Sequence, residues 1–288
     1  MSYPIALSER AFLGEIVTIE RQVAGHYTQD LLEQKILEAL RNGGKNPESL
    51  TPHDLDALDN LHLGGRESIQ ELSAFMDLYP GMRLLDVGCG VRGPARYFAE
   101  HGCQVTGIDL SAEFVRVATS LTNLVRLADN ASFQQGSALE MPFPSASFDG
   151  SYMIHVGMNI QDKAGLFREV ARMLKPGARF AIFDILRPSD GELLFPLPWA
   201  MTPETSFICT AHDYQRALEA AGLHLVHQRS RRQFAIEVME KRRRMVAAGS
   251  VLAVHLLMGE SAPLMLKNVN HAIVAGTLDP VDLVAVRN

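Results

Sequence analysis

The sequence predicts an α/β protein built on a doubly wound, mostly parallel β-sheet. Between residues 82 and 229, short β-like runs alternate with helix-like runs, which is the pattern of successive β-α-β units. A glycine-rich turn at residues 88–93 joins the first strand of this series to the first helix. Before Pro80-Gly81 the apolar spacing is helical instead, so we expect helices to precede the sheet.

The N-terminal region, residues 1–79, is predicted to form a helical cap. Within residues 29–41 the apolar side chains share one helical face, and residues 66–78 repeat the pattern. On the first of these faces we place Leu31, Leu32, Ile36, Leu37 and Leu40.

The remainder, residues 80–288, is predicted to be one domain with seven strands. We expect strands at residues 82–87, 104–109, 131–136, 149–154, 179–186, 223–228 and 279–286, with helices at 94–101, 111–121, 163–174 and 212–221. Two insertions interrupt the alternation, at about 188–210 and 232–276. Because doubly wound sheets bind ligands beyond the carboxyl ends of their strands, we expect these insertions to cover the ligand and to select the substrate.

Composition and charge argue against a nucleic-acid partner. Hydrophobic residues make up 47% of the chain and charged residues 21%, which fits a folded protein. A net charge of −6 provides no basic excess for binding a phosphate backbone. The one basic run, Lys241-Arg242-Arg243-Arg244, lies near Glu237 and Glu240 and is predicted to be a solvated helix face.

The three cysteines are an odd, scattered set, so neither a disulfide framework nor a metal site is expected. The first residues lack the basic start and continuous apolar core of a signal peptide. The apolar run at 251–259 is too short to cross a bilayer. We therefore expect a soluble, cytoplasmic protein without a membrane partner, and the sequence leaves its oligomeric state open.

Gly88, Gly90 and Gly93 form the pattern G-x-G-x-x-G between a strand and a helix, where a ligand can approach the backbone closely. The glycines alone leave three interpretations open: a structural turn, a nicotinamide site and a methyl-donor site. Asp109 ends the next strand, where a carboxylate can accept hydrogen bonds from both hydroxyls of a ribose. It could instead cap the following helix, as could Ser111.

Four ordered blocks narrow this choice: DVGCGVRG (86–93), GIDLS (107–111), GSALEMPFPSASFDG (136–150) and REVARMLKPGARFAIFDIL (168–186). Together they resemble the successive motifs of class I S-adenosylmethionine-dependent methyltransferases, which have a Rossmann-like fold. Four further segments resemble the small-molecule branch that includes sarcosine and dimethylglycine N-methyltransferases: HLGG (62–65), HVGMNIQDK (155–163), PLPWA (196–200) and LDPVDLVAV (278–286). The resemblance implies that the cofactor is S-adenosylmethionine and that S-adenosylhomocysteine is a product.

The resemblance also implies how the cofactor is held. Asp86 would support the loop and the cofactor's amino group, with Gly88 and Gly90 beneath the methionine moiety. Asp109 would hold the ribose, and Leu110 would pack on the adenine.

At Ser137-Ala138 the sequence departs from the family, which commonly has an acid there that bonds the adenine amino group. A serine hydroxyl can still form a hydrogen bond but gives no charge assistance. Adenine binding would then depend more on the backbone and on packing.

Two histidines are candidates for the region around the transferred methyl group. His155 follows the fourth predicted strand, where the resemblance places residues that face the methyl, and it could orient the cofactor carboxylate or relay a substrate proton. The alternative is a structural histidine at the end of the strand. His62, with Gly64-Gly65, would contact the methionine carboxylate, or would simply belong to a turn between helices.

Met158 and Trp199 are the predicted substrate contacts. Trp199 lies in the first insertion and could wall a pocket for an apolar or cationic substrate, although core packing is the alternative. Met158 and Met153 are expected in the core or the pocket wall. Arg66 and Arg92 could add charge near the cofactor, or could simply be exposed.

The predicted activity is in-line methyl transfer to a small molecule, with an amine nitrogen favoured as the acceptor over O- or C-methylation of a natural product. A phenol or an activated carbon would need a proton acceptor such as His155 or Asp184. A catalyst on the same fold that retains its cofactor, such as a cyclase, stays open, as do a nicotinamide oxidoreductase and a partner-binding module.

Overall fold

The structure, a computed structural model, describes residues 18–26, 31–56, 62–91, 93–188, 190–247 and 258–288. Its strands are β1 (Arg83–Val87), β2 (Gln104–Asp109), β3 (Ala131–Gln135), β4 (Phe148–Ile154), β5 (Leu174–Leu186), β6 (Leu223–Ser230) and β7 (Asp279–Arg287). Each lies within a few residues of a predicted strand.

The strands form a single seven-stranded sheet in the order β3-β2-β1-β4-β5-β7-β6. Strand β7 runs antiparallel to both β5 and β6, whereas β1 to β5 pair in parallel. This confirms the predicted fold class. The chain places β2 and β3 on one side of β1 and then crosses to β4 on the other side. The carboxyl ends of β1 and β4 therefore flank the point at which doubly wound sheets bind ligands.

The helices are α2 (Leu32–Asn42), α4 (Gly65–Ser73), α5 (Gly93–Glu100), α6 (Ala112–Leu124), α7 (Lys163–Met173), α8 (Ala211–Ala220), α9 (Arg232–Ala247) and α11 (Ala262–Ala275). Residues 18–26 are also helical. Short 3₁₀ turns are η1 (Pro47–Ser49), η2 (Pro52–Leu55), η3 (Gly157–Asn159), η4 (Pro203–Thr205) and η5 (Gly259–Ser261).

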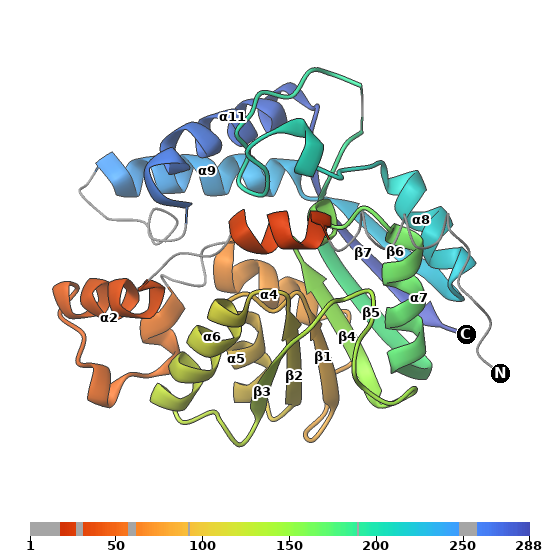
Figure 1. Cartoon of the computed structure of the whole chain (residues 1–288), viewed down its shortest axis with the longest axis horizontal. Helices are drawn as coiled ribbons and strands as arrows, with labels where there is room; N and C mark the ends of the chain where they lie inside the picture. The colour runs from red at the N-terminus through yellow and green to blue at the C-terminus, as the bar shows by residue number, and fades with distance from the viewer. Residues whose placement is uncertain (1–17, 27–30, 57–61, 92, 189, 248–257) are drawn as a thin grey trace.

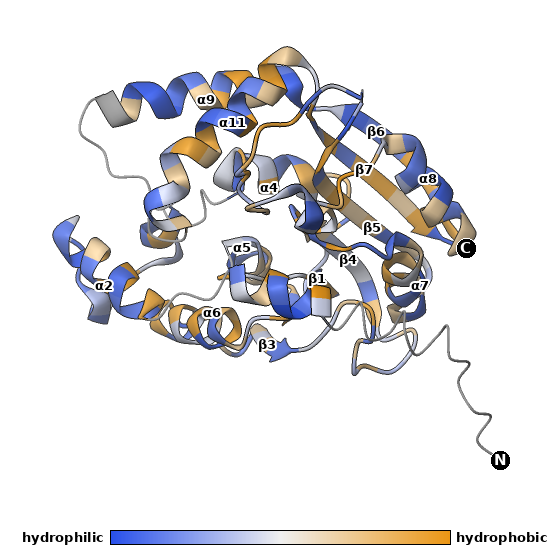
Figure 2. Ribbon diagram, turned by 45° about the horizontal axis from the view of Figure 1, so that its top comes forward, coloured by the Kyte–Doolittle hydropathy of each residue, from blue (hydrophilic) through white to orange (hydrophobic). Residues whose placement is uncertain are grey.

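Alternate residues of the central strands enter two separate cores, one on each face of the sheet. In β4, Tyr152 and Ile154 pack on the face that carries α4 and α5, while Met153 packs on the opposite face. In β5, Phe183 and Phe180 are divided in the same way. In Figure 2, β5 and β7 are coloured mostly apolar, whereas α8 and α9 carry both polar and apolar residues. A sheet covered on both faces accounts for these nearly continuous apolar runs.

The predicted N-terminal helices are present as α2 and α4. Leu32, Ile36 and Leu40 of α2 are buried, as expected from their spacing. Leu31 is an error in that prediction: it precedes the helix with a φ of 69° and its side chain is 58% exposed. Ile69 and Leu72 of α4 share a core with β1 and β4, so this helix packs directly on the sheet. The division into a cap and a second domain at residue 80 stays a prediction.

The two insertions lie beyond the carboxyl edge of the parallel strands. The described residues of the first insertion, 190–210, form a mostly irregular segment, and α9 and α11 come from the second insertion. In Figure 1 these two helices lie side by side above the sheet, with helical residues 18–26 beneath them. Within the described part of the chain, no helix is long and apolar enough to cross a membrane.

Candidate active site

A cavity of about 390 Å³ opens at the carboxyl ends of β1, β2 and β4. Its roof comes from helical residues 18–26 and from both insertions. Nine of the predicted site residues line it: His62, Gly88, Gly90, Asp109, Leu110, Ala138, His155, Met158 and Trp199. Gly64, Gly65, Asp86 and Ser137 do not line it. Each lies one or two positions from a residue that does. Positions far apart in the sequence therefore converge on one site.

The glycine turn after β1 forms the floor of the cavity. Gly88 has a φ of 67°, and a Cβ added there would lie 2.5 Å from both Cγ atoms of Val156. Gly90 has a φ of 47°. Both backbone conformations favour glycine. Gly88 therefore has no room for a side chain, and a turn without side chains can present its backbone directly to a ligand.

Asp109 lies at the tip of β2 and faces this turn. Its Oδ2 accepts a hydrogen bond from the Gly90 backbone N–H at 2.6 Å, and its Oδ1 accepts one from the Ser111 N–H at 2.9 Å. Ser111, rather than Asp109, caps α6, because its Oγ accepts a hydrogen bond from the Phe114 N–H. The carboxylate of Asp109 is therefore held rigidly at the cavity wall, and a carboxylate in this place suits a vicinal diol.

Asp86 lies beneath the turn. It is fully buried in β1, and the Tyr152 hydroxyl donates to its Oδ2 at 2.8 Å. This position fits support of the turn, while a direct contact with the cofactor's amino group stays a prediction. Arg66 pairs with Glu100 at 2.9 Å and does not line the cavity, and Arg92 lies outside the described residues.

Ser137 reaches a partner that its sequence neighbours do not reveal. Its hydroxyl donates to Glu20, a cavity-lining residue 117 positions earlier in the chain. Ser137 Oγ also accepts a hydrogen bond from the Leu139 N–H at 3.0 Å. A carboxylate is thus present beside Ser137, although the chain lacks an acid at 137 or 138 itself.

His155 combines an unusual backbone conformation with a buried ring. Its φ is 54°, its N–H donates to the Phe183 carbonyl at 2.8 Å, and its ring meets Phe183 edge-on at 4.8 Å. Its Nε2 is buried and has no hydrogen-bond partner among the described residues. Burial, with repulsion from His62 and Arg242, lowers the pKa of His155 to about 3. The imidazole is therefore neutral near pH 7 and a weak proton acceptor.

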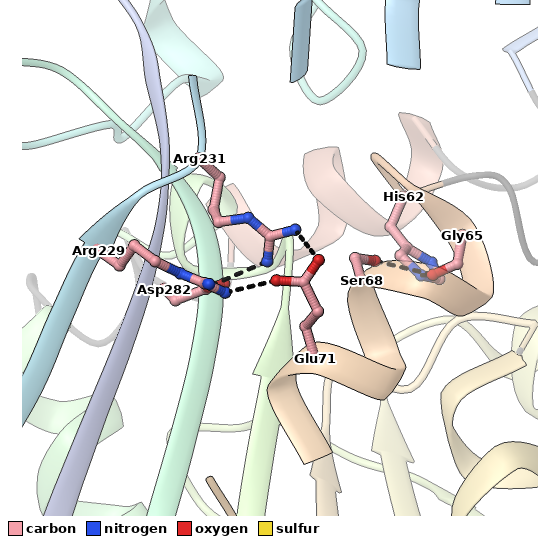
Figure 3. A network of polar contacts seen from close by, with 7 residues as sticks. All are labelled: His62, Gly65, Ser68, Glu71, Arg229, Arg231 and Asp282. Carbon is pink, nitrogen blue, oxygen red and sulfur yellow. Dashed lines mark hydrogen bonds and ion pairs between the residues drawn. The ribbon is translucent and has the colours of Figure 1, made fainter. Parts of the chain in front are cut away.

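His62 lies opposite His155, with ring centroids 6.5 Å apart. Its Nε2 pairs with the Gly65 carbonyl at 3.0 Å, and the Ser68 hydroxyl donates to the same oxygen (Figure 3). Gly64 has a φ of 84°, and a Cβ there would lie 2.5 Å from the Phe234 ring. The two glycines therefore let α4 begin tightly against α9, which sets the position of His62.

A half-buried ion-pair network ties α4 to strands β6 and β7. Asp282 of β7 accepts from Arg229 at 2.6 Å and from Arg231 at 3.0 Å. The same two arginines reach Glu71 of α4 at 2.8 and 3.1 Å. Figure 3 shows this network beside the turn that carries His62.

The part of the cavity formed by the insertions is mostly apolar, with Arg242, Ser261 and Asn270 as its polar members. Trp199 is 4% exposed, and its indole N–H donates to the Ser206 hydroxyl at 2.9 Å. Met158 is also buried. The remaining apolar lining here is Ile185, Met201, Met239, Met258, Met265, Leu266, Val269 and Ile273. Two aromatic residues of the first insertion, Phe195 and Phe207, do not line the cavity, and Leu256-Leu257 of the second insertion lie outside the described residues.

The predicted solvated face of the basic run is wrong for one of its four members. Lys241, Arg243 and Arg244 are exposed, as predicted, but Arg242 lines the cavity and donates to the His62 carbonyl at 3.1 Å. Burial lowers the pKa of Arg242. The error arose because a run of like charges resembles a solvated face, whereas helix packing turns one of the four inward.

Asp184 lies beneath the site rather than in it. Its Oδ2 accepts hydrogen bonds from the Gly157 N–H at 2.8 Å and from the Tyr214 hydroxyl at 2.7 Å. It does not line the cavity, so it is not placed to accept a substrate proton. Its position suits it to hold the segment that follows His155.

Replacing Asp184 with asparagine is expected to remove a pH dependence of folding. Burial raises the pKa of Asp184 from 3.8 to about 6, despite hydrogen bonds from Tyr214 and Gly157 and attraction to Lys163. The folded state therefore binds this proton more tightly than the unfolded chain. Its contribution to the free energy of unfolding falls as pH rises from 3.8 to about 6 and is constant above.

Urea unfolding from pH 4 to 7 measures this effect. The wild type should lose on the order of 2–3 kcal/mol relative to Asp184→Asn across that range. Carboxylates with a lowered pKa, such as Asp149 and Glu169, act in the opposite direction in both proteins, so they cancel in the difference. Parallel pH profiles for the two proteins would contradict the assignment.

Known proteins resemble this chain in both sequence and fold. A family model described as a methyltransferase domain matches residues 85–182. The 27-O-demethylrifamycin SV methyltransferase of Amycolatopsis mediterranei is 30% identical over 205 residues, which cover 67% of this chain and 70% of that protein. For many other curated relatives, the match spans no more than half of the relative's own length. A sterol 24-C-methyltransferase of Gibberella zeae, for example, is matched over 28% of its length.

Solved structures share the fold. A sarcosine dimethylglycine methyltransferase from Galdieria sulphuraria has a TM-score of 0.65 and 20% identity, covering 78% of this chain and 85% of that one. A geranyl diphosphate C-methyltransferase from Streptomyces coelicolor has a TM-score of 0.68 and 18% identity, covering 94% and 98%. At these identities the likeness is one of fold.

Proposed function

Because the chain belongs to the class I S-adenosylmethionine-dependent methyltransferases, we propose that it transfers a methyl group from that cofactor to a small apolar amine. The observation that carries the proposal is a single cavity with two different ends. One end has the glycine turn and Asp109, and the other is lined by methionines and Trp199.

The residues at the first end fit the cofactor. Asp109 would hold the ribose, Leu110 and Ala138 would contact the adenine, and the Glu20–Ser137 pair would place a carboxylate near its amino group. The methionine moiety would lie over Gly88 and Gly90, where no Cβ blocks its approach. When bound, S-adenosylmethionine supplies a methyl group already activated by its sulfonium.

The chemistry of the described cavity wall favours an amine as the acceptor. A neutral amine attacks the methyl group without prior loss of a proton, whereas a phenol or a carbon requires a base. His155 is a poor base because its pKa is about 3. The lining carboxylates Glu20, Asp109 and Asp162 already accept hydrogen bonds from protein donors. The tasks left to the protein are to exclude water and to align the nucleophile.

Two features favour the uncharged form of such an amine: the apolar end of the cavity, lined by methionines and Trp199, and the positive charge of Arg242. We call this end the apolar chamber. Burial against methionine and tryptophan side chains stabilises an apolar body and disfavours an ammonium group. Methionines also adapt to acceptors of irregular shape.

The test is incubation with methyl-labelled S-adenosylmethionine and a panel of apolar amines, with matched alcohols and phenols of the same skeleton. The proposal predicts label in an amine and an equal amount of S-adenosylhomocysteine. Label confined to oxygen or carbon would contradict the amine assignment. Conversion of a compound without label would indicate a cofactor-retaining catalyst such as a cyclase.

His155→Asn should lower turnover with an amine acceptor by roughly ten- to a hundredfold, because loss of the imidazole from the cavity wall loosens the alignment of the acceptor with the methyl group, while affinity for S-adenosylhomocysteine should change much less. Asparagine tolerates a positive φ, so this variant keeps the backbone at 54° and removes only the imidazole. Turnover and calorimetric affinity are measured on the same preparation. Equal losses in both quantities would assign His155 to cofactor positioning instead.

A further inference from the structure

Arg231 lies where β6 passes into α9 and is the more deeply buried of the two arginines in the ion-pair network. Its side chain is 3% exposed, against 39% for Arg229. Both arginines bond the same two carboxylates, Asp282 of β7 and Glu71 of α4 (Figure 3). Because Asp282 is fully buried, its negative charge depends on these partners. The two arginines are therefore alike in their ion pairs.

The two arginines differ in the aromatic rings that they face. The Cζ of Arg231 lies 4.0 Å from the centroid of the Phe234 ring and 5.6 Å from that of Phe183. The Cζ of Arg229 instead lies 5.8 Å from the centroid of Phe75. A guanidinium at these distances is attracted to the face of an aromatic ring. The ion pairs that hold Arg231 in place thus also hold the two rings against it.

Each of these two rings contacts one of the cavity histidines or its turn. Phe183 meets the His155 ring edge-on at 4.8 Å, and its carbonyl accepts the His155 N–H at 2.8 Å. Phe234 packs on Gly64, where an added Cβ would lie 2.5 Å from the ring. Gly64 follows His62 by two residues, and the two histidine rings are 6.5 Å apart. One buried cation therefore contacts the rings that position both histidines.

The backbone of Arg231 is fixed independently of its side chain. Its N–H donates to the Pro280 carbonyl at 2.7 Å, and its carbonyl accepts the Ala235 N–H of α9 at 2.8 Å. A substitution that removes only the guanidinium keeps both of these bonds. The start of α9 should then stay in place, so an effect of the substitution on the cavity reports on the guanidinium.

We propose that Arg231 is a positioning residue for methyl transfer, which holds His155 and the turn that carries His62 by stacking on Phe183 and Phe234. The inference rests on the proposed function, in which His155 helps to align the acceptor with the methyl group. Arg231 does not line the cavity, so it acts through these neighbours. A planar guanidinium suits this role, because it can pair with carboxylates in its plane while its faces stack on rings.

The test compares Arg231→Gln with Arg229→Gln. Each variant leaves one arginine on Asp282 and Glu71, but only Arg231→Gln removes the cation stacked on the two rings. Turnover of an amine acceptor is measured where urea unfolding shows both variants to be fully folded. Arg231→Gln should lower kcat roughly tenfold while affinity for S-adenosylhomocysteine changes by less than about threefold. In Arg229→Gln, kcat should stay within about twofold of the wild type.

Proton NMR of the histidine rings measures the position of His155 without any substrate. The edge-on Phe183 ring shifts the His155 ring protons through its ring current, so a displacement of either ring moves these signals. The His155 signals are assigned by their loss in His155→Asn. They should move in Arg231→Gln and stay in place in Arg229→Gln, whereas a role in stability alone would leave them unmoved in both folded variants.

Arg231→Lys is the second variant and is used if Arg231→Gln unfolds. It keeps a positive charge for Asp282 and Glu71 but has no planar faces to stack, so the His155 signals should move and kcat should fall here too. Unmoved His155 signals in the Arg231 variants, or equal losses of kcat in Arg231→Gln and Arg229→Gln, would overturn the inference. If no amine is methylated while the His155 signals move only in the Arg231 variants, the proposed function fails and the positioning of His155 by Arg231 stands.

Discussion

Asp109→Ala is expected to weaken binding of S-adenosylhomocysteine by roughly 5- to 150-fold, about 1–3 kcal/mol. The side chain lines the cavity at the tip of β2 and is held by the Gly90 and Ser111 N–H groups. A carboxylate fixed in this way can accept hydrogen bonds from two ribose hydroxyls without losing side-chain freedom on binding. Isothermal titration calorimetry measures the change in affinity.

Two controls separate ribose binding from support of the turn. Asp109→Asn keeps an oxygen that can accept from the Gly90 N–H but removes the negative charge, so its affinity should lie between those of the wild type and Asp109→Ala. Asp129→Ala removes an exposed acid outside the cavity and should bind normally. If Asp109→Ala bound as tightly as the wild type, the ribose assignment would be wrong.

Gly88→Ala is expected to reduce both stability and cofactor binding. The new Cβ would lie 2.5 Å from both Cγ atoms of Val156, on a backbone with a φ of 67°. The clash and the backbone strain together should lower the free energy of unfolding by about 2–4 kcal/mol. The turn must also shift, so affinity for S-adenosylhomocysteine should fall at least about tenfold. Urea unfolding and calorimetry measure the two effects.

A second substitution tests the cause of this loss. Val156→Ala removes the atoms with which the new Cβ collides, so the Gly88→Ala/Val156→Ala double variant should recover part of the lost stability. The strain from the positive φ would remain, so recovery should be incomplete. Simple addition of the two single effects would show that the collision with Val156 is not the cause.

The strands and helices of the sheet could be predicted because each is encoded by local spacing. The run from Phe180 to Leu186, for example, is apolar at nearly every position because β5 is covered on both faces. The place of β7 between β5 and β6 could not be predicted, since strand order depends on pairing between distant segments. Leu31 was misplaced because spacing alone does not show where a helix begins.

The same limit applies to the site. The glycine turn and Asp109 follow directly from strand ends, so the sequence indicates them. Glu20 reaches Ser137 across 117 positions, and Arg242 points inward because α9 packs against α11. These contacts arise from tertiary packing, and the surrounding residues carry no local signal for them. This is also why the cofactor end could be predicted in more detail than the acceptor end.

The most direct test of the central claim is calorimetric titration of the wild-type chain with S-adenosylhomocysteine, alongside NAD and NADP. A methyltransferase should show one S-adenosylhomocysteine site per chain, lost or strongly weakened in Asp109→Ala, and no comparable binding of either nicotinamide cofactor. Preferential binding of NAD or NADP, or no binding of S-adenosylhomocysteine, would contradict it.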